Sequence, residues 1–191
     1  DGRAPLLEDQ AKGPVANPVE MGMKDVETAM ERVRKIPGYK AYFDKAFGEN
    51  SMTVENAAKA VAAFERTLIT PNSAYDKYVK GDKQAMTEPQ IRGMDTFATS
   101  GCTSCHSGAA FNGPQMKLGE GFFTKFPTFT DSEYVAQYKL ADDKGRQEVT
   151  GNVADANMFR TQTLRNITDT APYFHNGAVN DLAEAVRVMA K

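Results

Sequence analysis

Residues 101–108 read GCTSCHSG and contain the pattern Cys-x-x-Cys-His. Cys102 and Cys105 are the only cysteines of the 191-residue chain, and His106 is one of its two histidines. Thiols and imidazoles are the side chains that most often ligate metals or attach cofactors. Both cysteines and one of the two histidines lie within five consecutive positions, so this motif is the first candidate for a metal or cofactor site.

Four kinds of site use two cysteines at this spacing. A redox-active dithiol follows a strand in a thioredoxin-like βαβ pattern, which this sequence lacks. A structural zinc ion needs four ligands, and the chain offers only the motif and the distant His175. A disulfide across two residues closes too small a loop to stabilise much. Haem c attachment uses the whole motif, since the thiols of Cys102 and Cys105 bond the vinyl groups and His106 ligates the iron. We therefore expect one haem c.

A haem that transfers electrons usually has a second axial ligand, and a methionine thioether raises its potential. The chain has nine methionines. Met116 follows the motif so closely that the chain would have to turn back at once. Met189 lies in the apolar stripe of an expected C-terminal helix, where an ordinary core methionine is the simpler interpretation. The pattern alone leaves the choice open.

The composition is that of a globular protein, with 41% hydrophobic and 25% charged residues. A net charge of -2 with interleaved signs provides no basic stripe, which argues against nucleic acid as a partner. The longest apolar run, residues 60–64, is far shorter than the roughly 20 residues of a membrane span. The chain begins at Asp1 without an initiator Met or leader, so we expect a removed signal peptide or a longer parent protein.

The dominant hydrophobic period is helical, which predicts a mostly α fold. Apolar residues recur at three and four over 54–68, Thr87 with Gln90 marks a second helix, and Asp181 with Glu184 marks a third. Shorter helices are expected over 24–35, 39–47 and 73–80. Between 107 and 179, Gly, Pro, Thr and Asn predict a long, mostly irregular region wrapped around a group.

Six further stretches resemble the bacterial dihaem cytochrome c peroxidases, a family that includes the MauG-type enzymes. They are DGRAP at 1–5, QAKGP at 10–14, NPVEMG at 17–22, TLITP at 67–71, LRN at 164–166 and TAPYFHNGA at 170–178. The resemblance implies a periplasmic enzyme with two cytochrome c-like helical domains, each with one haem. A low-potential haem reduces hydrogen peroxide, and a high-potential haem supplies electrons from a small cytochrome c or cupredoxin.

The chain departs from that family pattern at both ends. A first Cys-x-x-Cys-His, its distal His and a tryptophan are expected before DGRAP and are absent, as is a further C-terminal helix. We therefore expect an internal part of the enzyme, inactive alone, with one haem where the whole enzyme has two. Residues 1–70 would be the remnant of the peroxidatic domain, and residues 71–191 the cytochrome c-like electron-transfer domain with long irregular loops.

The resemblance also implies roles for single residues. Cys102 and Cys105 are similar to the thioether anchors, His106 to the proximal ligand and Met189 to the distal ligand of the high-potential haem. The spacing from His175 to Met189 agrees with the family. Glu20 and Gln10 resemble catalytic pocket residues, in which a carboxylate moves the proton of peroxide and an amide orients it. Without the resemblance, Glu20 is one more solvated acid.

Two further kinds of contact are predicted, a calcium site and arginine partners for the haem propionates. The carbonyls of Thr170 and Pro172 resemble calcium ligands, and hard carbonyl oxygens suit that ion, although a third ligand belongs to a missing segment. Arg160 and Arg165 are candidates to pair with haem propionates, with surface arginine as the alternative. The resemblance leaves a homodimer open.

Three functions follow, in order of preference. The first is a cytochrome c peroxidase. The second is a MauG-like enzyme that oxidises a protein, in which a tyrosine replaces Met189. The third is a monohaem cytochrome c electron carrier, which needs neither Glu20 nor Gln10. A second Cys-x-x-Cys-His upstream of Asp1 would favour an enzyme over the carrier.

Overall fold

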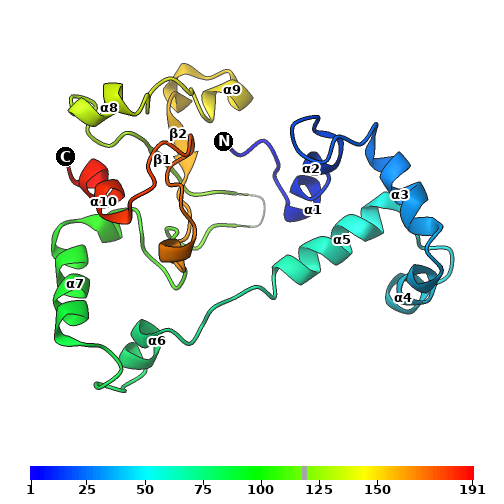
Figure 1. Ribbon diagram of the computed structural model, residues 1–191, viewed down its shortest axis with the longest axis horizontal. Helices are drawn as coiled ribbons and strands as arrows, with labels where there is room; N and C mark the ends of the chain where they lie inside the picture. Colours follow the sequence, from blue (N-terminus) through cyan, green and yellow to red (C-terminus); the bar gives the residue numbers. More distant parts are fainter. Residues whose placement is uncertain (118–119) are drawn as a thin grey trace. The chain divides into compact units, whose positions relative to one another are not determined.

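A computed structural model describes residues 1–117 and 120–191 (Figure 1). The chain divides into two compact units. The N-terminal unit comprises residues 4–70, and the C-terminal unit comprises residues 71–191 together with residues 1–3. The described elements are mostly helical, which confirms the predicted fold class.

The N-terminal unit consists of five helices. They are α1 (Leu7–Gln10), α2 (Gly13–Ala16), α3 (Val26–Arg34), α4 (Pro37–Phe47) and α5 (Val54–Glu65). The longer three confirm the helices predicted over 24–35, 39–47 and 54–68, within one turn at each end. Side chains cap α3 and α5, since Asp25 accepts from the Thr28 amide and Thr53 accepts from the Asn56 amide. The four-residue helices α1 and α2 are too short to show a helical period, so the sequence did not predict them.

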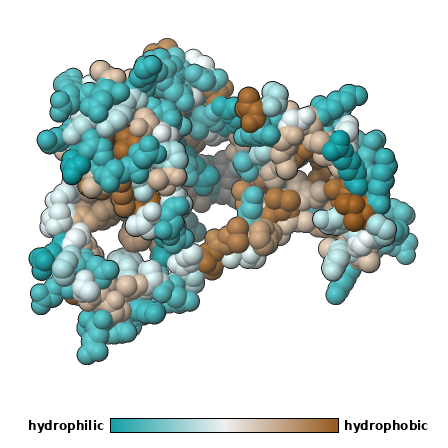
Figure 2. Space-filling view, viewed as in Figure 1, coloured by the Kyte–Doolittle hydropathy of each residue, from teal (hydrophilic) through white to brown (hydrophobic). Residues whose placement is uncertain are grey.

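The helix α5 packs differently from what its apolar period predicts. Its buried residues are Ala58 and Ala62, and it contacts α1 and α3. Larger apolar side chains of the predicted face are exposed instead. Figure 2 shows this apolar surface along α5 and the segment after it, formed by Val61, Phe64, Leu68 and Ile69. The small alanine side chains allow the close approach of the neighbouring helices, which leaves the large side chains outside that contact.

The C-terminal unit contains the three helices that the sequence predicted there. They are α6 (Ala74–Val79), α7 (Glu88–Thr99) and α10 (Leu182–Ala190). The expected capping contacts are present, because Gln90 accepts from the Thr87 amide and Asp181 from the Glu184 amide. Buried side chains of this unit include Leu140, Val179, Ala185 and Val188.

The described residues of the region from 107 to 179, which leave out 118–119, are largely irregular, as predicted, but they hold several short elements. They are β1 (Phe123–Lys125), α8 (Glu133–Gln137), α9 (Gln147–Thr150), β2 (Met158–Arg160) and the 3-10 turns η2 (Val153–Asp155) and η3 (Ile167–Asp169). The strands pair antiparallel, with Thr124 opposite Phe159. Strands of three residues are too short for an alternating pattern to reveal them.

None of the helices in residues 1–117 and 120–191 combines the length and apolar character that crossing a membrane requires.

Candidate haem site

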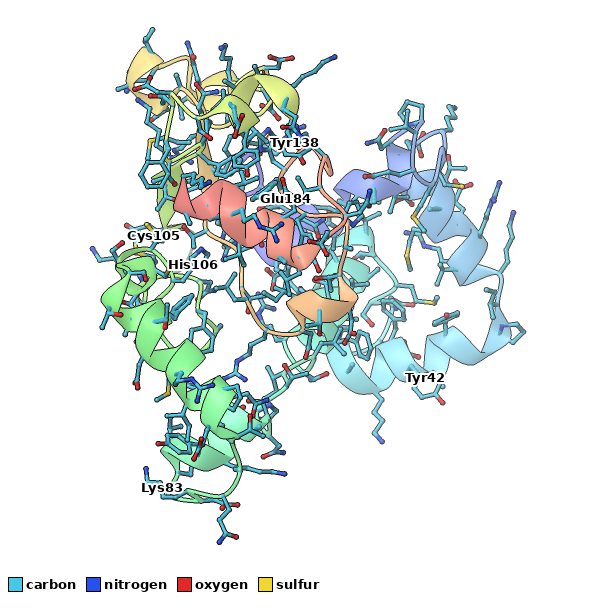
Figure 3. All side chains as sticks on the ribbon, turned by 60° about the vertical axis from the view of Figure 1, so that its left-hand side comes forward. Tyr42, Lys83, Cys105, His106, Tyr138 and Glu184 are labelled. Atoms are coloured by element: carbon cyan, nitrogen blue, oxygen red, sulfur yellow. The ribbon has the colours of Figure 1, made fainter. Side chains whose placement is uncertain are left out.

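The Cys-x-x-Cys-His motif forms a single tight turn at the end of α7. Gly101 adopts a left-handed conformation with φ 83° and leads into η1 (Cys102–Ser104). The amides of Cys105 and His106 both donate to the carbonyl of Cys102, over 3.3 and 2.9 Å. Spacings of three and four along such a turn place both thiols and the imidazole on one side. Figure 3 shows Cys105 and His106 together at the end of this helix.

The orientation of the His106 ring is fixed through its Nδ1 atom. Nδ1 lies 2.9 Å from the carbonyl oxygen of Phe111. A carbonyl oxygen only accepts hydrogen bonds, so Nδ1 carries the proton and Nε2 keeps its lone pair. This is the arrangement that metal-ligating histidines use. Cys102 and Cys105 are free thiols, the first exposed and the second half-buried. The donor set therefore fits haem c, with the thiols as anchors and Nε2 as the iron ligand.

The loop that follows the motif is folded back on itself. The Gly113 amide donates to Ser107 over 3.2 Å, and the Phe111 amide donates to Gly108 over 3.1 Å. Three successive carbonyls of this loop accept side-chain hydrogen bonds: Ala109 from Arg165, Ala110 from Thr163 and Phe111 from His106, over 2.8, 2.6 and 2.9 Å. Side chains 53 to 56 residues away in sequence thus hold the backbone that orients the His106 ring.

Arg165 is engaged in a two-pronged ion pair with Asp76 of α6. Its Nη1 and Nη2 lie 2.9 and 2.7 Å from the two carboxylate oxygens, and both side chains are largely buried. Hydrogen bonds from Arg165 and from Ser73 hold the pKa of Asp76 well below its usual range, and Asp76 raises the pKa of Arg165. Arg165 thus has a protein carboxylate and the Ala109 carbonyl among its partners, and its pairing with a haem propionate stays a prediction. Arg160 is exposed at the end of β2, and its role stays a prediction.

Aromatic rings surround the His106 loop. The ring of Phe111 meets that of Tyr75 edge-on at 5.1 Å, and Phe97 of α7 lies 6.3 Å from Phe111 and 6.5 Å from His106. Tyr75, Asp76 and Phe111 are not among the residues that the sequence predicted for the site. The Ser73 and Asp76 pair has the spacing of a helix cap, and Asp76 does fill that role, but no sequence signal points to its second contact with Arg165.

The two methionines considered as distal ligands lie in different surroundings. Met189 lies on α10, two residues before the end of the chain, and is 38% exposed. Met116 lies in the segment after the His106 loop and is 40% exposed. In both views the helix α10 lies on the same side of the unit as the turn of Cys105 and His106 (Figures 1 and 3). The role of Met189 stays a prediction.

Comparison with known proteins finds similarity to dihaem cytochrome c peroxidases. The family model described as Di-haem cytochrome c peroxidase matches residues 1–84. Cytochrome c551 peroxidase of Nitrosomonas europaea is 40% identical over 191 residues, which cover 100% of this chain and 53% of that protein. The chain is similar to dihaem cytochrome c peroxidases, with a relative aligned over its whole length and the family model matched over residues 1–84. This confirms the resemblance that the sequence motifs indicated.

Other relatives show the same similarity. Cytochrome c551 peroxidase of Pseudomonas aeruginosa is 39% identical, and the match covers 99% of this chain and 52% of that protein. The crystal structure of a MauG-like protein associated with microbial copper homeostasis superimposes with a TM-score of 0.75 at 28% identity, covering 95% of this chain and 55% of that chain. The chain thus spans about half the length of the relatives it matches.

The two residues expected in the peroxide pocket both lie in the N-terminal unit. Gln10 ends α1, and Glu20 lies in the turn after α2. Hydrogen bonds fix this turn, because the Glu20 amide donates to the Asn17 carbonyl over 3.1 Å and the Val19 amide donates to the Asn17 side chain over 3.1 Å. The side chains of Gln10 and Glu20 are exposed. Their catalytic roles in a dihaem peroxidase stay predictions.

The residues expected to bind calcium lie on exposed backbone. Thr170 follows η3, and Pro172 comes two residues later in the loop before α10. The described part of the chain brings together no group of three or more His, Cys, Asp or Glu side chains that could hold a metal ion. A site made of carbonyl oxygens is a different kind of site, so the calcium prediction stays as it was.

His175 lies apart from the Cys-x-x-Cys-His turn in sequence and packs among aromatic rings. Its ring stacks on Phe159 of β2 at 4.1 Å and meets Phe126 edge-on at 5.8 Å. Much of the side chain is exposed, but these rings cover one face. Desolvation lowers the pKa of His175, and the charge of Asp143 opposes that shift. The neutral imidazole is therefore favoured in this environment.

Proposed function

We propose that this chain is the electron-transferring haem domain, with part of the peroxidatic domain, of a cytochrome c peroxidase. The enzyme would reduce hydrogen peroxide to water with electrons from a small cytochrome c or cupredoxin. The observation that carries the proposal is the His106 geometry, in which Nδ1 bonds the Phe111 carbonyl and Nε2 is free for iron beside two free thiols. The peroxidase relatives at 40% and 39% identity support the reaction.

Residues of the C-terminal unit would hold the electron-accepting haem. Cys102 and Cys105 would form the thioether bonds, and His106 would ligate the iron through Nε2. When bound, the haem supplies a one-electron carrier. The thioether of Met189 would be the distal ligand and would raise the potential, which suits a haem that accepts electrons from a small donor.

Residues of the N-terminal unit would act on the peroxide. Hydrogen peroxide, two electrons and two protons give two water molecules. The carboxylate of Glu20 would take the proton from one peroxide oxygen and return it to the leaving oxygen, as general base and then general acid. The amide of Gln10 would orient the peroxide. The whole enzyme would carry a second haem for this step.

The remaining assignments follow from the same similarity. Residues 1–70 would belong to the peroxidatic domain and residues 71–191 to the electron-transfer domain. We place the enzyme in the periplasm, where small cytochromes and cupredoxins act as donors. The carbonyls of Thr170 and Pro172 would contribute to a calcium site, and a homodimer is compatible with this arrangement.

A MauG-like enzyme that oxidises a protein is the second candidate. The observation in its favour is the TM-score of 0.75 to a MauG-like protein. The methionine at position 189, where the MauG pattern has tyrosine, favours the peroxidase. A simple electron carrier would leave Glu20 and Gln10 without a function.

The test uses the full-length haem-loaded protein and compares Glu20→Ala with Glu49→Ala. Both residues are exposed acids in turns of the N-terminal unit, so the second variant is a matched control. We expect Glu20→Ala to lower peroxide turnover by roughly 10²- to 10⁴-fold, the range of a general acid-base group. Glu49→Ala should keep the turnover of the wild type. Equal turnover in the two variants would show that Glu20 is only a solvated acid.

A further inference from the structure

We propose that Arg165 is a positioning residue for the haem ligand His106, and that Asp76 holds Arg165 in place for this task. The proposal rests on the proposed function, in which His106 ligates iron through Nε2. It adds a route, a chain of contacts through which Asp76 of α6, 30 residues before His106, sets the orientation of that ligand.

The route consists of direct contacts. Ser73 donates to Oδ2 of Asp76 over 2.7 Å from its hydroxyl, and both carboxylate oxygens accept from Arg165. The third nitrogen of the guanidinium, Nε, donates to the Ala109 carbonyl over 2.8 Å. The loop then continues through Ala110 to Phe111, whose carbonyl accepts from Nδ1 of His106. A planar guanidinium with its two terminal nitrogens fixed also has a fixed Nε direction.

The loop needs such support because Phe111 has an unfavourable backbone conformation. Its φ is 54°, in the left-handed region that bulky side chains rarely adopt. This conformation aims the Phe111 carbonyl at His106. Residues in such regions persist only where the surroundings determine them, and they concentrate at functional sites.

One helix and one arginine supply these surroundings. Tyr75 and Asp76 are neighbours on α6, and the first packs against the Phe111 ring while the second holds Arg165. The Arg165 guanidinium also lies 5.7 Å from the centre of the Phe111 ring. Asp76 is buried, with 8% of its surface exposed, so its charge requires a partner. The ion pair of Asp76 and Arg165 therefore fixes the position of the Arg165 guanidinium, unlike an ion pair between solvated surface side chains.

The consequence for the haem concerns the donor strength of His106. A hydrogen bond from Nδ1 to a carbonyl makes the imidazole a stronger donor and fixes the ring. A stronger donor stabilises ferric iron and lowers the potential. Loss of Arg165 should free the loop, weaken the bond from Nδ1 to Phe111 and raise the potential of the haem. A merely structural ion pair would lower stability without changing the ligand.

The experiment uses full-length haem-loaded protein and compares Arg165→Met with Arg66→Met. Arg66 forms the same two-pronged pair with Glu8, over 2.8 and 3.1 Å, within the N-terminal unit, so it is a matched control. The measurements are the potential of this haem and solvent exchange of the His106 Nδ1 proton, by NMR of the ferrous form. In Arg165→Met, exchange should become at least about tenfold faster, the factor for losing one hydrogen bond of ordinary strength, and the potential should rise. Arg66→Met should change neither.

Other outcomes separate the possible failures. Wild-type exchange and potential in folded, haem-loaded Arg165→Met would overturn the positioning role. If Arg165→Met does not fold, Asp76→Asn takes its place. Asp76→Asn keeps the shape of the side chain, so Nδ1 proton exchange and the haem potential should change in the same direction but less. Wild-type exchange and potential in Asp76→Asn would also overturn the positioning role of Arg165. Wild-type protein without covalent haem would overturn the proposed function itself.

Discussion

The phenolic hydroxyl of Tyr138 donates a hydrogen bond to Oε1 of Glu184 over 3.1 Å, which ties the end of α8 to the helix that carries Met189 (Figure 3). Two contacts reinforce this tie. Arg187 donates to Oε2 of Glu184 over 2.8 Å, and Asn176 donates to the Tyr138 carbonyl over 2.8 Å. The first half of α10 is thus held by side chains, while Met189 lies in its last turn. Whatever loosens Tyr138 should therefore loosen Met189.

Tyr138→Phe removes this hydroxyl and keeps the ring. Because the Tyr138 hydroxyl loses its carboxylate acceptor, the free energy of unfolding should fall. If Met189 is the distal ligand, the methionine-to-iron charge-transfer absorption should also weaken in the haem-loaded protein. Tyr134→Phe is the control, since it keeps the 6.1 Å ring pair and leaves the Tyr138 hydroxyl in place. Equal absorption in both variants would show that the tie does not affect the ligand.

Met189→Leu tests the distal ligand itself. The substitution keeps the volume of the side chain and removes the sulfur. In the full-length protein it should abolish the charge-transfer absorption and lower the potential of this haem, because a thioether ligand raises the potential. Met116→Leu, at a similarly exposed methionine, should leave both unchanged. The opposite result would assign the ligand to Met116.

Gly113→Ala tests the loop that carries Phe111. Gly113 has φ 100°, and an added Cβ would overlap the ring of Phe122. Left-handed backbone costs a residue with a side chain roughly 1–2 kcal/mol, and overpacking adds about 1–3 kcal/mol. Gly151 has φ 70° with open space around it, so Gly151→Ala should show the backbone cost alone. A urea-unfolding difference between the two variants below about 1 kcal/mol would mean that the Phe122 contact relaxes easily.

The sequence predicted the elements and residues whose signals are local. The helices with caps at Thr87 and Asp181 formed where expected, because capping depends on residues three positions apart. The Cys-x-x-Cys-His turn is likewise set by backbone hydrogen bonds within five residues. The support of His106 was not predictable, since it joins Asp76 to Arg165 across 89 positions and uses a backbone carbonyl, which has no sequence signature.

The same distance in sequence explains why the contact between Arg165 and Asp76 was not predicted. An arginine near a haem motif suggests a propionate partner, because guanidinium matches carboxylates of any source. A carboxylate that it contacts within the chain belongs to Asp76, whose sequence context predicts only a helix cap. The contact between Arg165 and Asp76 depends on the fold, because α6 packs against the loop after the motif only in the folded chain.

The pair of Asp76 and Arg165 also predicts a specific response to acid. Hydrogen bonds from Arg165, and then from Ser73, lower the pKa of Asp76 from its ordinary value of 3.8. As pH falls below that value, the unfolded chain binds a proton that the folded carboxylate refuses, so this stabilisation is present above about pH 4 and declines as pH approaches the lowered pKa. The difference in unfolding free energy between wild type and Asp76→Asn should be constant from about pH 7 to 5 and shrink below about pH 4.

A double-mutant cycle assigns this pH dependence to the ion pair. In the Arg165→Met background, Asp76 keeps only the hydrogen bonds of Ser73, so adding Asp76→Asn should change the pH profile much less than it does in the wild type. Urea unfolding at each pH measures the four proteins under matched conditions. A wild-type difference that stays constant down to pH 3, or an equal change in both backgrounds, would show that Arg165 does not hold the charge of Asp76. If the pH dependence follows the prediction, Asp76 stays charged in the folded protein well below neutral pH. The ion pair with Arg165, and with it the support of His106, then persists across the physiological pH range, because neither partner changes its charge in that range.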